Sequence, residues 1–345
     1  MTMPMTSRQR MLDALNYNHP DRIPVVYHPS PAGLLAHGQK LLDLFNQHPP
    51  DNPVNFDRLP ELKPGTVDAN GRYHEVRTDE WGTTWEWLIY GLYGHPKGFP
   101  LANLAAAQDY VFPPAPDIGD ASFLADRARV ELEKRDYFVI SGGVTIFEKL
   151  CALRPMDELL VDLLTGDPAL LGVLDRLVDH MLRVVKYQLA LGVDGIFFGD
   201  DWGTQNAPIV SPKLFREVFK PRYRALMEPI QRAGCQVCFH SCGSLGELFD
   251  DLLDLGIDVF WPQILRYDEE TLARICKEHR VTIYLHPDRQ RLIPLGTPAE
   301  IEARIAAYAE RYHALGGGCI FYVEIENDAP FENVKALIES VDRYR

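Results

Sequence analysis

Val237-Cys-Phe-His-Ser-Cys-Gly-Ser244 is the stretch of this sequence that says most about the fold, because an apolar run changes within it into a polar turn. The run over residues 237–239 predicts a buried strand. A helix is expected directly afterwards, since Ser244-Leu-Gly-Glu247 has the spacing of a capping box. The stretch therefore predicts one strand-to-helix unit with a polar turn at the end of the strand.

The same succession of apolar run, polar turn and helical segment recurs along the chain after about residue 136. Gly316-Gly-Gly318 precedes a strand, so it predicts a helix-to-strand turn and not a phosphate-binding loop. Strands alternating with helices imply a parallel sheet, and polar residues after nearly every strand favour a (β/α)8 barrel over an open doubly wound sheet. Strands are predicted at 137–140, 194–198, 236–239, 257–260, 281–285 and 319–323, and helices at 170–191, 215–233 and 301–315.

The first 135 residues are less regular and contain many prolines. A helix is predicted over residues 7–18, and the first barrel strand over residues 23–27. Residues 73–77 and 83–88 predict a small antiparallel hairpin. We expect one (β/α)8 domain over residues 1–345, in which an irregular insertion at about 60–135 places this hairpin over the barrel mouth.

Composition and charge exclude several classes of function. A formal charge of −14 argues against a nucleic acid or an anionic membrane surface as partner. No apolar run approaches about 18 residues, and residues 1–10 lack the apolar core of a signal peptide, so a cytoplasmic protein is expected. The six cysteines are scattered, which fits reduced thiols with one metal site better than disulfides.

His240 and Cys242 place an imidazole and a thiol two residues apart at a predicted strand end, where α/β barrels build active sites. Zinc binds nitrogen and sulfur ligands of this kind. The helix expected near Ser244 would place its positive end beside Cys242 and lower the pKa of the thiol. Cys235 and Cys238 are expected to pack on opposite faces of the strand. The alternative to a metal site at His240 and Cys242 is a buried cysteine beside a capped turn.

Other predicted strand ends carry further candidates. Asp200 and Asp201 are candidates for a carboxylate that orients a ligand or binds substrate, or for a helix cap. His286 ends the next-to-last strand, where it would contact substrate or be solvated. The candidates for catalysis are Asp200, Asp201 and His286, and those for substrate binding are Tyr27, His28, Trp81, Trp202 and Gln205.

These landmarks resemble the uroporphyrinogen decarboxylase superfamily, which includes the zinc methyltransferases that serve corrinoid proteins. The resemblance covers nearly the whole chain. The true decarboxylases carry an arginine-rich segment after the first strand, whereas Tyr27-His-Pro-Ser-Pro-Ala-Gly33 contains no arginine. A tetrapyrrole with many carboxylates needs several cations. The motifs that carry the resemblance to the superfamily include Ser7-Arg-Gln-Arg-Met-Leu-Asp-Ala-Leu15, Phe198-Gly-Asp-Asp-Trp-Gly203, His240-Ser-Cys-Gly243 and Glu332-Asn-Val334.

The methyltransferase branch implies that His240, Cys242 and one later residue bind zinc. Cys319 opens a predicted strand, so it would stand at the far end of that strand from His240, beyond the reach of a zinc bond of about 2 Å. Counting back from Glu332-Asn-Val334 puts the family's ligand position near 324–326. Glu324 is therefore the favoured third ligand, with Glu326 and Cys319 as substitutes.

The resemblance implies a zinc-dependent methyltransferase that moves a methyl group between a small molecule and the corrinoid (cobalamin) of a partner protein. O-demethylation of a methoxylated compound is the preferred version. Two alternatives stay open, a metal-free uroporphyrinogen-type decarboxylase and a non-enzymatic barrel that binds a metal or a small ligand. Barrels of this type often self-associate, so a homo-oligomer is compatible with the resemblance.

Overall fold

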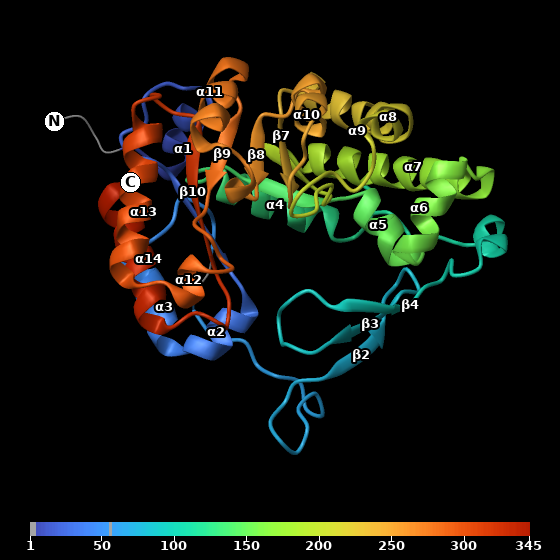
Figure 1. Ribbon diagram of the computed structural model, residues 1–345, viewed down its shortest axis with the longest axis horizontal. Helices are drawn as coiled ribbons and strands as arrows, with labels where there is room; N and C mark the ends of the chain where they lie inside the picture. The colour runs from blue at the N-terminus through green and yellow to red at the C-terminus, as the bar shows by residue number, and fades with distance from the viewer. Residues whose placement is uncertain (1–4, 55–56) are drawn as a thin grey trace.

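A parallel sheet of seven strands forms the centre of the computed structural model, which describes residues 5–54 and 57–345 (Figure 1). The strand order is β1-β10-β9-β8-β7-β6-β5, so strands that follow one another in the chain are neighbours, and the first lies beside the last. The strands are β1 (Val25–Pro29), β5 (Ile140–Val144), β6 (Gly195–Gly199), β7 (Gln236–Ser241), β8 (Val259–Pro262), β9 (Thr282–Leu285) and β10 (Cys319–Ile325).

The predicted α/β class is confirmed, with parallel strands in barrel order. The sheet curls into a half-barrel, because no pairing joins β1 to β5 in the part of the chain that the structure describes. Each strand predicted from an apolar run overlaps an observed one, although β5 begins only at Ile140 and its pairing with β6 is irregular between Ser141 and Val144. The glycine triplet lies between a helix and β10, as predicted.

Helices cover the outer face of the sheet, and local signals set their ends. The longest, α7, begins after Asp167, whose side chain accepts from the N–H groups of Ala169 and Leu170, and ends at Gly192 in the left-handed conformation. The α-helices are α1 (Ser7–Leu15), α2 (Pro31–His37), α3 (Gln39–Gln47), α4 (Phe123–Glu133), α5 (Phe147–Leu153), α6 (Met156–Thr165), α7 (Pro168–Leu191), α8 (Pro212–Leu214), α9 (Lys220–Arg232), α10 (Leu248–Leu255), α11 (Glu269–His279), α12 (Leu292–Leu295), α13 (Pro298–His313) and α14 (Phe331–Tyr344). Shorter helical turns are η1 (Leu104–Gln108), the π-helical η2 (Phe215–Phe219) and η3 (Ile264–Arg266).

Alternation along the strands divides the core into two layers. The outer layer packs between the sheet and the helices, and includes Val237 and Phe239 of β7. The inner layer faces the hollow of the half-barrel. Its buried members include the aromatic residues Phe138, Tyr284 and Tyr322, together with Cys238. The side chains of one strand therefore serve two environments, and residues of even number on β7 point inward.

A second, three-stranded antiparallel sheet comes from the irregular N-terminal part. It contains β2 (Glu75–Thr78), β3 (Thr84–Trp87) and β4 (His95–Gly98). The first two strands form the predicted hairpin, whereas β4 was not predicted. Figure 1 shows this sheet on the side of α2 and α12, which is the side on which β1 and β9 end.

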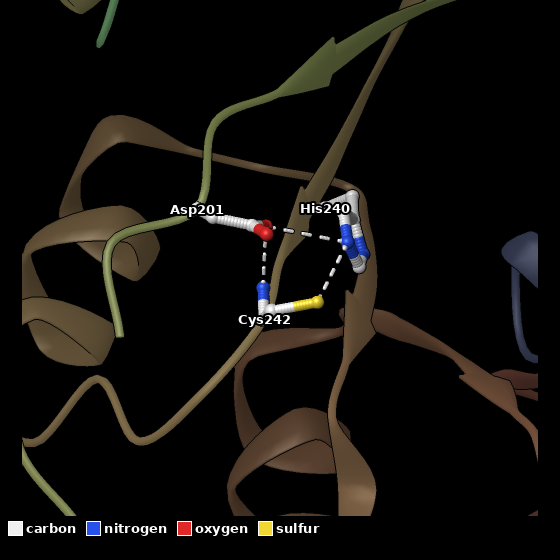
Figure 2. Close-up of side chains that lie close together, drawn as sticks. All are labelled: Asp201, His240 and Cys242. Atoms are coloured by element: carbon white, nitrogen blue, oxygen red, sulfur yellow. Dashed lines mark hydrogen bonds and ion pairs between the residues drawn. The ribbon is translucent and has the colours of Figure 1, made fainter. Parts of the chain in front are cut away.

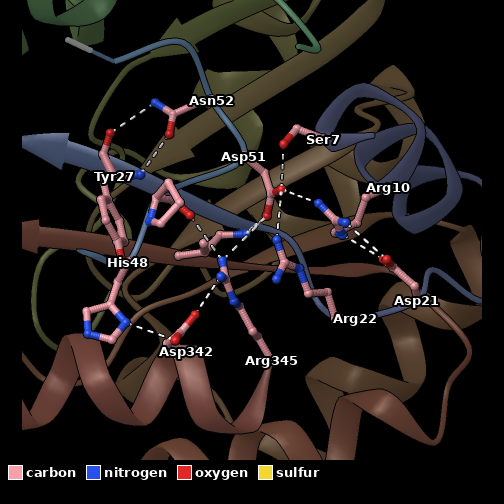
Figure 3. A network of polar contacts seen from close by, with 12 residues as sticks. Ser7, Arg10, Asp21, Arg22, Tyr27, His48, Asp51, Asn52, Asp342 and Arg345 are labelled. Carbon is pink, nitrogen blue, oxygen red and sulfur yellow. Dashed lines mark hydrogen bonds and ion pairs between the residues drawn. The ribbon is translucent and has the colours of Figure 1, made fainter. Parts of the chain in front are cut away.

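The buried carboxylate of Asp51 ties the N-terminal end of the half-barrel together (Figure 3). It accepts hydrogen bonds from the Ser7 hydroxyl, the Arg10 guanidinium and the N–H of Val25, so it joins α1 to the start of β1. The Nη1 atom of Arg345 lies 4.0 Å from Asp51 Oδ2, and the Arg345 guanidinium also pairs with Asp342 of α14. Among the described residues, no helix has the length and apolar character needed to cross a membrane.

Candidate metal centre

Three side chains that can bind a metal ion converge at the ends of β6 and β7 (Figure 2). Asp201 follows β6, and His240 and Cys242 stand at the end of β7. The Nε2 atom of His240 lies 3.4 Å from Asp201 Oδ1 and 3.4 Å from Cys242 Sγ. Among the described residues, this is the one group of three or more His, Cys, Asp or Glu side chains whose ligand atoms lie within 4.8 Å of one another.

Alternation explains why Asp201 faces this centre and Asp200 does not. Asp200 is fully buried on the outer side, and burial raises the pKa of its carboxyl although four donors oppose this. Three of those donors hold the start of α5 and one holds α9 against the end of β6, and the catalytic role of Asp200 stays a prediction. The donors are the hydroxyls of Thr145 and Tyr223, both at 2.6 Å, and the N–H groups of Ile146 at 2.9 Å and Glu148 at 2.8 Å.

Two glycines let the turns after β6 and β7 touch. A Cβ on Gly243 would lie 2.2 Å from the carbonyl carbon of Gly203, and one on Gly203 would lie 2.6 Å from the carbonyl carbon of Gly243. Gly243 also has a φ of +78°, which side chains rarely tolerate. Because of this close approach, the N–H of Cys242 donates to Asp201 Oδ1 at 2.8 Å.

The backbone of the next strand sets the tautomer of His240. Its Nδ1 atom lies 2.9 Å from the carbonyl oxygen of Trp261, and a carbonyl only accepts, so Nδ1 carries the proton. Burial lowers the pKa of His240, although the charge of Asp201 opposes this. The ring is therefore held neutral, and the lone pair of Nε2 faces Asp201 and Cys242. Metal-binding histidines are oriented by a partner of this kind.

The predicted low pKa of Cys242 is wrong for the protein without metal. Burial, together with the charge of Asp201, raises the pKa of the thiol to about 12. The helix expected at Ser244 begins only at Leu248, and no side chain caps it. Gly243 and Gly246 both have positive φ and delay the helix, so its dipole acts farther from the sulfur than expected. A metal ion would be needed to form the thiolate at neutral pH.

The structure brings Asp201, not Glu324, to the His240–Cys242 pair. The carboxylate of Glu324 forms an ion pair with Arg289, which also lies 3.5 Å from Glu326. Cys319 is the first residue of β10 and is buried in the outer core layer. Its side chain therefore points to the helices and away from His240 and Cys242. This is a second reason, besides its position at the start of the strand, why Cys319 is not near the metal centre. The favoured third ligand, Glu324, stays a prediction.

A cavity of about 310 Å³ opens beside His240 and Cys242. Among its described charged residues, one arginine faces three carboxylates, so the lining favours a neutral or cationic molecule. Gln263, which was not predicted, accepts from the N–H of Gly243 at 3.0 Å and lies 3.4 Å from Gln205. The other lining residues of the turns include Gln205, His286, Asp288, Arg289, Gln290, Glu326 and Asp328.

His286 lines this cavity but is committed to the backbone. Its Nε2 atom lies 2.7 Å from the carbonyl oxygen of Pro262, and Nδ1 lies 3.2 Å from that of Pro287. Burial lowers the pKa of His286 to about 4, so the ring is neutral at physiological pH. A neutral imidazole has one N–H, so the shorter contact indicates that Nε2 donates to Pro262 and helps to shape the cavity wall, while the predicted catalytic role of His286 stays a prediction.

The aromatic residues predicted to bind substrate lie in the packing of the fold. Trp202 is fully buried in the outer layer, where its ring stacks on Phe147 with centroids 4.3 Å apart. Trp81 packs edge-on against His180 of α7, and the ring of Tyr27 packs against Phe45 of α3. Strand alternation carries the position of Trp202 to the outer face, the same side as Asp200. His28 has an exposed side chain that lines the hollow of the half-barrel, and Tyr27 also borders this hollow.

Glu148 is the residue of this region that sequence reasoning undervalued. Burial and the charges of Asp201 and Asp200 raise the pKa of its carboxyl to about 7. It stands in the first turn of α5, where the N–H groups of Ile146 and Glu148 donate to Asp200. A glutamate at a helix start is common in any sequence, so no local signal distinguishes it.

Comparison with known proteins places this geometry in a family. The methyltransferase from Methanosarcina mazei is similar over 99% of this chain and 99% of its own, with 16% identity and a TM-score of 0.66. At this identity the similarity shows a shared fold. A B12-independent methionine synthase from Shewanella sp. W3-18-1 matches 80% of this chain and 74% of its own at 9% identity, with a TM-score of 0.44.

No curated protein sequence matches the chain significantly. The sequence profile of uroporphyrinogen decarboxylase (URO-D), in contrast, matches residues 137–344, which hold β5 to β10 and all three side chains of the metal centre. The matched segment covers more than half of the chain. The chain therefore belongs to the uroporphyrinogen decarboxylase (URO-D) family.

Proposed function

We propose that this protein is a zinc-dependent methyltransferase, in which Asp201, His240 and Cys242 hold the metal ion. One observation carries the proposal, the convergence of a carboxylate oxygen, an imidazole nitrogen and a sulfur within 4.8 Å. Zn²⁺ is bound by these three donor types, and three protein ligands leave a position for substrate in catalytic sites. The shared fold of the methyltransferase from Methanosarcina mazei supports the choice of reaction.

The methyl group would move between a small molecule and the corrinoid of a partner protein. Zn²⁺ bound here would supply Lewis-acid polarisation of the substrate atom that carries or receives the methyl group. We prefer a methoxylated compound as methyl donor, since a neutral ether suits a cavity in which one arginine faces three carboxylates. When the ether bond breaks, its electron pair stays on the oxygen, which finally takes up a proton.

The residues of the chain would orient this chemistry. The carbonyl of Trp261 fixes the His240 ring, and the turn held by Gly203 and Gly243 fixes Asp201 beside Cys242. Gln205 and Gln263 lie side by side in the cavity lining, where their amide groups would contact substrate. The glutamates 324 and 326 hold Arg289 at the cavity edge.

The decarboxylase alternative has less support. A substrate with many carboxylates needs several free cations, whereas Arg289 is already paired with Glu324. The turn after β1 also carries no arginine. A decarboxylase of this kind needs no metal ion, so metal content separates the two functions.

Metal analysis of the purified protein, repeated for His240→Ala and Cys242→Ala, tests the metal site. We expect about one zinc per chain in the wild type and loss of most of it in both variants. Methyl transfer from a panel of methoxylated donors to free cob(I)alamin tests the reaction. Wild-type protein that is active without metal, and equally active in both variants, would refute the zinc proposal.

A further inference from the structure

A second cavity of about 500 Å³ lies inside the half-barrel, between the edges formed by β1 and β5. The interior of a closed barrel is filled by layers of side chains, so a hollow of this size is unusual there. It falls within the volume range of small-molecule sites. Its walls come from strands β1, β5, β6, β8, β9 and β10, and α1 and α4 line its rim.

Aromatic rings form one wall of this interior cavity. Tyr284 and Tyr322 stack with centroids 5.4 Å apart and an angle of 15°, and Trp261 lies 4.1 Å from Tyr322. The imidazole of His28 stacks on the other side of this set, 6.1 Å from Tyr322. Ring faces of this kind bind planar molecules by offset stacking.

The wall carries two hydroxyl groups that the protein leaves unused. Tyr284 and Tyr322 are each 5% exposed, and within the described residues neither hydroxyl has a hydrogen-bond partner. Because both side chains line the cavity, their hydroxyls are placed to donate to the oxygen atoms of a bound molecule.

The charges around the cavity favour a neutral ligand. The strand residues that line it include no Asp, Glu, Lys or Arg. At the rim, Arg129 and Glu133 of α4 pair with each other at 3.1 Å. An ionised ligand would therefore lose its hydration inside without gaining an opposite charge.

The cavity adjoins the metal centre through one side chain. The ring of Trp261 lines the cavity and packs on His240, with centroids 4.1 Å apart. We propose that this interior cavity binds the planar body of a neutral aromatic ether, with Tyr284 and Tyr322 donating to its oxygen atoms. The methyl donor of the proposed function would lie in the cavity beside His240 and Cys242, so the interior cavity is a separate site, and its occupation does not rest on the proposed function.

Calorimetric titration of metal-free and zinc-loaded protein with guaiacol (2-methoxyphenol) tests the proposal. We expect saturable binding of one guaiacol per chain in both forms. Tyr284→Phe and Tyr322→Phe should each weaken binding by about two- to tenfold, the usual effect of one hydrogen bond. Ile140→Trp, which fills the cavity from β5, should abolish it. Benzoate and the non-planar 2-methoxycyclohexanol should bind much more weakly than guaiacol.

Tyr308→Phe and Tyr312→Phe are matched controls, because these hydroxyls of α13 are also buried and unpartnered but lie in the outer core layer. They should change guaiacol binding by less than about twofold. No guaiacol binding by the wild type, or equal loss in the control variants, would overturn the proposal. If Ile140→Trp does not fold, the double variant of Tyr284 and Tyr322 decides.

Discussion

Two polar clusters stand at opposite ends of the same half-barrel, and their hydrogen bonding differs in kind. Around Asp51, at the N-terminal end, a carboxylate meets only donors, from Ser7, Arg10 and the backbone of Val25 (Figure 3). At the C-terminal end, the side chains of Asp201, His240 and Cys242 face one another, and the Cys242 N–H donates to Asp201 while its sulfur lies 3.4 Å from His240 Nε2 (Figure 2). The first cluster is complete without a ligand, whereas the second is the one that we propose to hold a cation.

Burial adds to this difference. Asp51 is fully buried, and all its neighbours hold it in place, so its contribution is to the stability of the fold. Asp201 keeps 38% of its side chain exposed and His240 keeps 17%, so both stay within reach of a molecule in the mouth. The comparison teaches that the arrangement of donors and acceptors, and not the number of polar groups, separates a structural cluster from a binding site.

The largest effect on folding should come from breaking the structural cluster. Asp51→Asn removes the buried charge partner of Arg10 and leaves it only the partly exposed Asp21, and should lower the free energy of unfolding by about 3–5 kcal/mol. Chemical denaturation of the metal-free protein measures this. Asp21→Asn removes the other partner of Arg10, but Asp21 is 39% exposed, so the loss should be about 1 kcal/mol or less. Reduced zinc affinity in folded Asp51→Asn protein would break the comparison.

The second largest effect should come from a change in the proposed metal site, and it should appear in zinc affinity. Asp201→Asn removes a proposed ligand and should weaken zinc binding by at least about a hundredfold, beyond the effect of an outer partner. Glu324→Gln, in contrast, should change zinc affinity by less than about tenfold, since its carboxylate is paired with Arg289. Competition against a chromophoric chelator measures both. Zinc lost in Glu324→Gln and kept in Asp201→Asn would restore Glu324 as third ligand.

A third variant tests how the two turns are brought together. Gly243→Ala places a Cβ against the backbone of Gly203 at a φ of +78°, and should cost about 1–3 kcal/mol of stability and weaken zinc binding. Gly234→Ala is the matched control, because Gly234 has a φ of +67° and nothing within 4 Å of its Cβ. It should cost about 1 kcal/mol and leave zinc affinity unchanged. Equal zinc affinity in both variants would show that the close approach is not needed.

Sequence patterns predicted the parallel order of the strands and the pair His240–Cys242, because both depend on neighbours in the chain. The spacing of apolar runs sets the strands, and one turn sets the pair. The partner of the pair, Asp201, was expected to act in catalysis and not to join the metal ligands. Its position depends on two backbone segments that touch at Gly203 and Gly243, which no local pattern reveals.

Other differences have physical causes that lie closer to the sequence. The alternation that points Asp201 inward also points Asp200 and Trp202 outward. Whether a position in this segment is odd or even therefore predicts which face of the sheet its side chain occupies. The helix start at Leu248 follows from the positive φ of Gly243 and Gly246, which the capping-box spacing at Ser244 obscured. Cavities, in contrast, depend on which strand edges fail to pair.

Substitution of His286 should have the smallest effect on stability, and it tests whether this residue supports the metal site. Burial lowers its pKa to about 4, against about 6.5 when unfolded, so the unfolded chain binds more protons between these values. Stability should therefore be lost as the pH falls through this window, by about 1 kcal/mol from this residue between pH 7 and 5.5. Denaturation of wild type and His286→Leu at both pH values isolates the contribution. Because its ring nitrogens face backbone carbonyls, His286→Leu should not change zinc affinity. A large loss of zinc affinity in this variant would show that His286 contributes to the metal site.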